Sequence, residues 1–185
     1  MTICKFLVPA AIAALAVPAG AAVLVIGSTS ARLCYEAAEA RGIPSQTTLG
    51  YCNDALEKEV LNGYDLTATH VNRGILRLRR GSIDEAIADF DAAIAENPNE
   101  PEAYLNKGMA LLRLPNGWEG AVPLFNTAIE KRTRRPAIAY YGRAVAYEMG
   151  GQIKEAYYDY RQASVIDPKW RDPRVELARF TVRQE

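Results

Sequence analysis

Small and aromatic positions recur with helical spacing along residues 67–170 of the chain. Phe90 follows Ala86 by four residues and Ala93 follows three later, so the three side chains share one face of a helix. The same spacing returns about every 35 residues, at Ala121, Phe125 and Ala128 and again at Ala156, Tyr160 and Ala163. A fixed repeat of this length indicates a solenoid, in which each unit buries its apolar face against its neighbours.

Small residues also recur upstream of each alanine–aromatic face. Gly74 and Gly108 lie inside apolar-periodic segments, where glycine costs about 1 kcal/mol relative to alanine. We therefore expect another helix to approach closely at these glycines, and each unit to be a helical hairpin. Left-handed glycines are expected at the turns between the paired helices, at Gly81, Gly117 and Gly151.

The repeated stretches resemble the tetratricopeptide repeat, whose pattern is W-x₂-L-G-x₂-Y, A-x₃-F and P over 34 residues. They read THVNRGILRLRRGSIDEAIADFDAAIAENP, AYLNKGMALLRL…GAVPLFNTAIE and AIAYYGRAVAYEMGGQIKEAYYDYRQASVIDP. The resemblance implies an all-α fold, a short right-handed superhelix of three hairpins at residues 67–100, 101–136 and 137–170. The middle unit departs from the pattern by carrying two extra residues.

The segments that flank the repeats are expected to cap the array, because terminal units need an outer face that tolerates water. Residues 22–66 are interpreted as an N-terminal capping region with a degenerate helical hairpin. Its two helices are predicted at residues 30–41 and 48–59. Residues 171–185 are predicted to form a C-terminal capping helix, with Pro173 near its start.

The N-terminal residues carry no charge from Phe6 to Ala31 and follow a single lysine. With Ala19-Gly20-Ala21 as a cleavage site, this pattern predicts a secretory signal peptide over residues 1–21. A second, weaker cleavage site is available at residues 28–31. The alternatives are an uncleaved membrane anchor extending to about residue 31 and a cytoplasmic apolar arm. Export is favoured, and the protein is expected to be periplasmic or secreted.

Two cysteines, Cys34 and Cys52, remain if the signal peptide is removed together with Cys4. Cys34 lies on the first of the two helices predicted before Gly63, and Cys52 lies on the apolar face of the second. These two helices lack the bulk to hold each other. In an oxidising compartment we predict that the two cysteines form a disulfide. In a reducing cytosol the same pair would be two small buried thiols.

Charge limits the class of partner. The chain has 22 basic and 22 acidic residues, whereas a nucleic-acid-binding protein is normally strongly basic. The first helix of the first repeat nevertheless concentrates Arg73, Arg77, Arg79 and Arg80, and its second helix concentrates acids. Either these opposite charges help the two helices to dock, or the arginines form an anion-binding stripe for an acidic peptide.

Residues that would indicate an enzyme are missing from the pattern. His70, the one histidine, fills a position that is tyrosine in the other two repeats, so it is interpreted as a packing residue. No group of histidines, cysteines and carboxylates has metal-ligand spacing. We therefore expect no catalytic activity, no metal, no cofactor and no small-molecule substrate.

The family resemblance implies a non-enzymatic scaffold that binds a protein or peptide on the concave face formed by the first helices. The family's carboxylate-clamp pattern is not reproduced, because Val71 stands where that pattern has lysine. The alternatives are a membrane-tethered adaptor, if the N-terminal segment is retained, and an RNA-binding helical repeat. The predicted partner-binding residues are Val71, Asn72, Ile75 and Arg79; Leu105, Asn106, Met109 and Arg113; and Tyr141, Val145, Glu148 and Met149.

Overall fold

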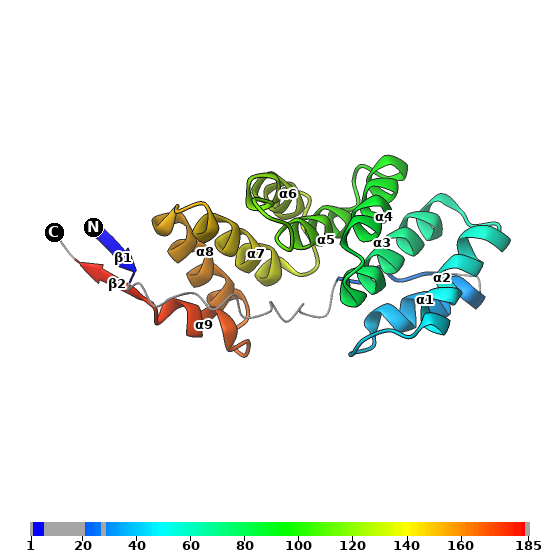
Figure 1. Ribbon diagram of the computed structural model, residues 1–185, viewed down its shortest axis with the longest axis horizontal. Helices are drawn as coiled ribbons and strands as arrows, with labels where there is room; N and C mark the ends of the chain where they lie inside the picture. The colour runs from blue at the N-terminus through cyan, green and yellow to red at the C-terminus, as the bar shows by residue number, and fades with distance from the viewer. Residues whose placement is uncertain (1, 6–20, 27–28, 184–185) are drawn as a thin grey trace.

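The computed structural model describes residues 2–5, 21–26 and 29–183. Nine helices lie within these ranges and follow one another as antiparallel pairs stacked side by side (Figure 1). The all-α repeat fold is confirmed. The helices are α1 (Thr29–Glu39), α2 (Gln46–Lys58), α3 (Gly63–Arg80), α4 (Ile83–Glu96), α5 (Pro101–Leu111), α6 (Trp118–Glu130), α7 (Pro136–Met149), α8 (Ile153–Ile166) and α9 (Asp172–Leu177).

The aromatic position of each repeat packs against the small position of its own first helix. Phe90 and Phe125 are fully buried. A Cβ atom added to Gly74 would lie 2.5 Å from Phe90 Cε1, and one added to Gly108 would lie 2.9 Å from Phe125 Cε1. These distances leave no room for a methyl group, which explains why the helices carry glycine at a cost in helix propensity.

Left-handed backbone occurs at two of the three predicted turn glycines. Gly81 and Gly151 have φ values of 85° and 75°. The prediction for Gly117 is wrong: its φ is −64°, and Asn116 takes the left-handed conformation instead, with φ of 56°. Gly117 is required for space, because a Cβ there would lie 1.8 Å from the carbonyl oxygen of Leu111.

Each repeat makes a polar contact to the preceding unit at an equivalent position. Arg73 of α3 donates to Asn53 of α2 at 3.0 Å, and Arg143 of α7 donates to Asn126 of α6 at 2.6 Å. Between them, the Lys107 ammonium lies 2.5 Å from an Asp91 carboxylate oxygen. A cation on the first helix therefore reaches an acceptor on the second helix of the unit before it.

The C-terminal cap is shorter than predicted. Helix α9 ends at Leu177, and residues Phe180–Arg183 form strand β2 instead of continuing the helix. Thr181 and Val182 are β-branched, so the sequence here favours an extended backbone. Strand β2 pairs antiparallel with β1 (Thr2–Lys5), with Thr2 opposite Arg183.

The predicted signal peptide falls largely outside the described residues, which omit 6–20. Its first residues, Thr2–Lys5, are strand β1. Within the described ranges, no helix combines the length and the apolar character needed to cross a membrane. Cleavage and export stay predictions.

Candidate peptide-binding groove

Residues 21–26 run as an extended segment across α3 and α5, on the side of the array opposite α4 and α6 (Figure 1). The Val23 N–H donates to Asn72 Oδ1 at 2.9 Å, and Asn72 Nδ2 donates to the Val23 carbonyl at 2.8 Å. One side-chain amide thus satisfies both backbone groups of one residue. We call the surface of α3 and α5 that holds this segment the amide groove.

Two further polar side chains hold the backbone of the segment. Ile26 N–H donates to Asp65 Oδ1 at 2.9 Å, and Asn106 Nδ2 lies 3.4 Å from the Ala21 carbonyl oxygen. Asp65 is fixed by Asn62, the N-cap of α3, whose Nδ2 donates to Asp65 Oδ2 at 2.8 Å. The sequence spacing of Asn62 and Asp65 does not indicate that Asp65 contacts residues 21–26.

Side chains of the segment alternate between buried and exposed from Val23 to Ile26. Val23 and Val25 are buried, and Val23 is 0% exposed. Leu24 and Ile26 are 46% and 69% exposed, whereas Ala21 and Ala22 are both buried. The period of two over residues 23–26 is that of a β-strand, so the amide groove contacts one face of an extended chain there.

The predicted binding residues of the first two repeats divide between this groove and the core. Asn72 and Asn106 contact the segment. The apolar members lie in one buried cluster with Val23 and Val25: Val71, Ile75, Leu105 and Met109.

Arg79 has an intramolecular role that the sequence analysis missed. Its two terminal nitrogens donate to the carbonyl oxygens of Ala38 and Ala40, both at 2.7 Å. These carbonyls belong to the C-terminal end of α1, where the helix itself offers no donors. Burial lowers the pKa of Arg79 and also that of Arg113. Arg79 therefore anchors the N-terminal hairpin, and its availability to a partner is reduced.

The predicted binding residues of the third repeat pack mainly against the C-terminal cap. The ring of Tyr141 lies 4.8 Å from that of Trp170 and 5.4 Å from that of Tyr160. Burial raises the pKa of Tyr141 to about 12. Glu148 accepts from the Tyr160 hydroxyl at 3.0 Å and from Arg179 at 2.5 Å. Val145 is half-buried, and Met149 is exposed.

An open groove of about 1060 Å³ was not foreseen from the sequence. It runs from the loop after α1 to the segment after α8, and we call it the cationic groove. Its apolar lining includes Ile43, Ile138 and Trp170. Its charged lining comprises Arg41, Arg79, Arg134, Arg135 and Lys169, against Asp167 and Asp172.

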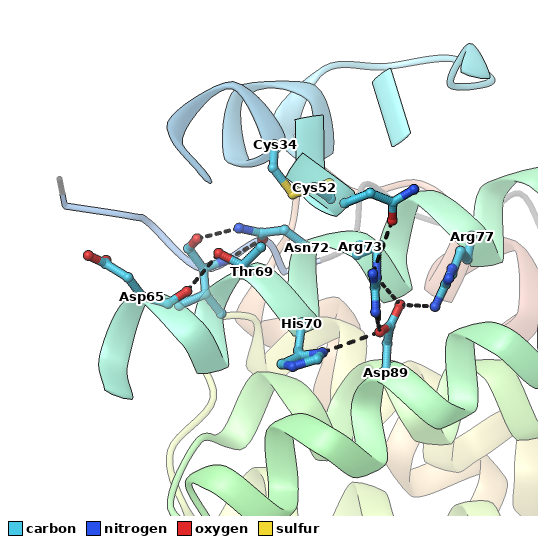
Figure 2. The surroundings of a disulfide bond; sticks show 11 residues. Cys34, Cys52, Asp65, Thr69, His70, Asn72, Arg73, Arg77 and Asp89 are labelled. Carbon is cyan, nitrogen blue, oxygen red and sulfur yellow. Dashed lines mark hydrogen bonds and ion pairs between the residues drawn. A yellow bond between two sulfur atoms is a disulfide. The ribbon is translucent and has the colours of Figure 1, made fainter. Parts of the chain in front are cut away.

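Two of the four arginines of α3 dock this helix against α4. Arg73 and Arg77 each approach Asp89 to 2.7 Å, and His70 Nδ1 lies 3.3 Å from the same carboxylate (Figure 2). Burial alone would raise the pKa of Asp89, but the hydrogen bonds of His70 and Arg73 and the charges of both arginines outweigh it and lower that pKa. An equivalent pair joins Arg143 to Asp159 at 2.6 Å. The docking interpretation of the opposite charges therefore describes Arg73 and Arg77.

Cys34 of α1 and Cys52 of α2 are fully buried, with their sulfur atoms 2.11 Å apart and their Cα atoms 4.9 Å apart (Figure 2). Both cysteines lie on the buried faces of their helices, beside Ala31 and Ala38 on α1 and Ala55 on α2. The described part of the chain contains no group of three or more histidine, cysteine or carboxylate side chains placed to hold a metal ion.

Comparisons with known proteins agree with this architecture. A family model described as tetratricopeptide repeat matches residues 71–117 and 116–169, more than half of the chain. The chain therefore belongs to the tetratricopeptide repeat family. Repeats of this family generally mediate protein–protein interactions, and proteins with this fold are typically non-enzymatic scaffolds. A comparison with curated protein sequences gave no match.

Three solved structures show the same fold at low sequence identity. The TPR domain of OM64 from Arabidopsis is 23% identical with a TM-score of 0.60, over 64% of this chain and 96% of that one. The first TPR domain of human RPAP3 is 24% identical with a TM-score of 0.57, over 61% and 87%. MamA from Desulfovibrio magneticus RS-1 is 23% identical with a TM-score of 0.60, over 71% of both chains.

Proposed function

We propose that this protein is a non-enzymatic scaffold of the cell envelope that binds an extended segment of a partner protein on its concave face. The observation that carries the proposal is the pair of hydrogen bonds between Asn72 and the two backbone groups of Val23. Contacts to the backbone accept many sequences, while alternate buried side chains select among them, as in strand-like peptide recognition. The groove thus has the chemistry needed to hold a chain rather than a small molecule.

The charge of the cationic groove favours an acidic partner segment. Arg135 and Lys169 are exposed, and the described residues place no acid in ion-pair contact with their side chains. Arg134, by contrast, already approaches Glu102 to 3.4 Å. Guanidinium and ammonium groups bind carboxylates through charge-assisted hydrogen bonds, so a partner with aspartate or glutamate beside its apolar residues would use both grooves.

We expect this scaffold to be exported from the cytoplasm. The uncharged N-terminal run resembles a secretory leader, and Cys34 and Cys52 are positioned for a bond that persists only in oxidising surroundings. A retained N-terminal segment would give a membrane-tethered version of the same adaptor.

The test compares three forms of the full chain as bait in a cross-linked envelope extract. In the groove variant, Arg135 and Lys169 are both changed to glutamate. In the matched control, Arg161, which is exposed on α8 and absent from the groove lining, is changed to glutamate. A partner held by the wild type and by R161E but lost from the groove variant supports the proposal. A partner held equally by all three forms would move the binding surface away from the concave face.

A further inference from the structure

We propose that residues 21–26 are an intramolecular ligand of the amide groove, and that a partner segment enters this groove only by displacing them. The inference rests on the proposed function, because it treats the amide groove as a site for extended chains. Beyond that function, residues 21–26 occupy the amide groove in the isolated protein, and their contacts define the chemistry that a competing segment needs.

The segment is held as a ligand would be, through its backbone and through one face. Asn72 satisfies the N–H and the carbonyl of Val23, and Asp65 accepts from Ile26. Val23 and Val25 enter the buried cluster of the repeats, while Leu24 and Ile26 point away from it. Asn72 is fully buried with the segment in place, and its amide loses both of these partners if the segment leaves, so it must then pair with water or with the backbone of another chain.

This arrangement defines the competing segment. Its residue opposite Asn72 needs a backbone N–H, which excludes proline. The residues two before and two after it must fit the spaces filled by Ala21 and Val25, so small and β-branched side chains are favoured. The position of Leu24 is free to vary because that side chain is half exposed, whereas the position of the buried Ala22 needs a small side chain. The preferred partner is therefore an extended segment of alternating small or β-branched residues.

Because the segment is connected to α1, it competes strongly with a free peptide for the amide groove. Only residues 27 and 28 separate Ile26 from Thr29, the first residue of α1. A short tether of this kind gives an effective concentration on the order of millimolar. A free peptide of the same sequence would bind poorly while the tethered copy is in place, because its apparent affinity falls with the fraction of open groove.

The first experiment measures backbone hydrogen exchange by NMR in the full chain. We expect the amide protons of Val23 and Ile26 to exchange at least about tenfold more slowly than those of an unstructured peptide of the same sequence. Asn72→Ala should remove this protection at Val23 while the amides of α7 and α8 stay protected. Exchange at Val23 at the unstructured rate in the wild type would overturn the inference.

The second experiment measures binding of a probe peptide by fluorescence anisotropy. The probe is fluorescein-labelled GAAVLVIG, the sequence of residues 20–27, followed by two lysines for solubility. The full chain carries either Val23→Asp, which places a charge at a buried position, or the matched control Leu24→Asp at an exposed one. We expect Val23→Asp to bind the probe at least about tenfold more tightly than the wild type and Leu24→Asp do.

A third variant shows where the probe binds, and circular dichroism shows that every variant keeps its helices. Val23→Asp combined with Asn72→Ala should lose the gain in probe binding. Equal binding by the wild type and Val23→Asp, or no binding by either, would overturn the inference. Neither result affects the capture test with the cationic-groove variant, so failure of the intramolecular ligand and failure of the scaffold proposal are distinguishable.

Discussion

Asn72 and Val23 are separated by 49 residues, yet one side-chain amide donates to and accepts from the same residue's backbone at 2.8 and 2.9 Å. Both residues are fully buried. This buried pairing allows only one register of the segment, because a shift by one residue would place a different side chain in the core. The contact therefore fixes the register of residues 21–26 against α3.

Asn72→Ala is expected to destabilise the protein. The substitution leaves the buried N–H and carbonyl of Val23 without partners, and each unsatisfied group costs about 1–3 kcal/mol. Urea denaturation monitored by circular dichroism measures the loss. Asn99→Ala is the control, since Asn99 is exposed, and the variant should unfold within about 0.5 kcal/mol of the wild type. Equal stability of the two variants would contradict the buried pairing.

Gly74→Ala and Gly50→Ala are expected to act in opposite directions. Both glycines lie inside helices, where alanine is intrinsically better by about 1 kcal/mol. A Cβ at Gly74 would collide with the Phe90 ring, whereas one at Gly50 meets nothing within 4 Å. Thermal denaturation should therefore show a net loss of about 1–3 kcal/mol for Gly74→Ala and a gain for Gly50→Ala. A gain at both sites would disprove the close packing of α3 and α4.

Cys52→Ala is expected to lower the unfolding free energy by about 3 kcal/mol in oxidising buffer, the chain-entropy value for a loop of this size. Cys34 and Cys52 are 18 residues apart in sequence. The wild type with and without dithiothreitol should show the same difference, and Cys4→Ser should show none. Identical denaturation midpoints in both buffers would mean that the bond does not form.

Asp89→Asn is expected to cost stability in a pH-dependent way. The folded pKa of Asp89 lies below its ordinary value, so the ionised carboxylate stabilises the fold above about pH 4. This contribution is lost as the pH falls through the folded pKa. Breaking the buried pairing costs about 3 kcal/mol at pH 7, and the difference from the wild type should narrow below about pH 4. Urea denaturation at a series of pH values measures it.

The exposed Asp84 supplies the control for this pH series, since Asp84→Asn removes a carboxylate from the first turn of the same helix. We expect that variant to lose at most about 1 kcal/mol. A constant difference between Asp89→Asn and the wild type down to pH 2 would contradict the assigned role of the carboxylate.

The repeats could be predicted from sequence because their signals are local. One hairpin is specified by Gly74, Ala86 and Phe90, which lie within a few helical turns of one another. Periodicity of this kind is the primary signal of secondary structure in a sequence. Asn72 and Asn106 were predicted as binding residues in the same way, because asparagine recurs at one position of two successive repeats.

The remaining features depend on contacts between segments far apart in sequence. The position of residues 21–26 was missed because all six residues are apolar and continue the uncharged N-terminal run, so the sequence does not distinguish them from the predicted leader. The roles of Arg79 and Glu148 were missed because each is set by a segment outside its own repeat, the end of α1 and the C-terminal cap. Strand β2 was missed because its pairing partner lies at the other end of the chain.

The polar contact between successive units also gives the array a direction. Asn53, Asp91 and Asn126 each present an acceptor to the cation of the following unit. The residue at the corresponding place on α8, five positions after Ala156, is Arg161, which is exposed. A further unit built like the others would bring its own cation into contact with this guanidinium, and two like charges in contact repel each other. The contact between units therefore cannot be repeated after α8, because Arg161 carries a positive charge where the other units have an acceptor.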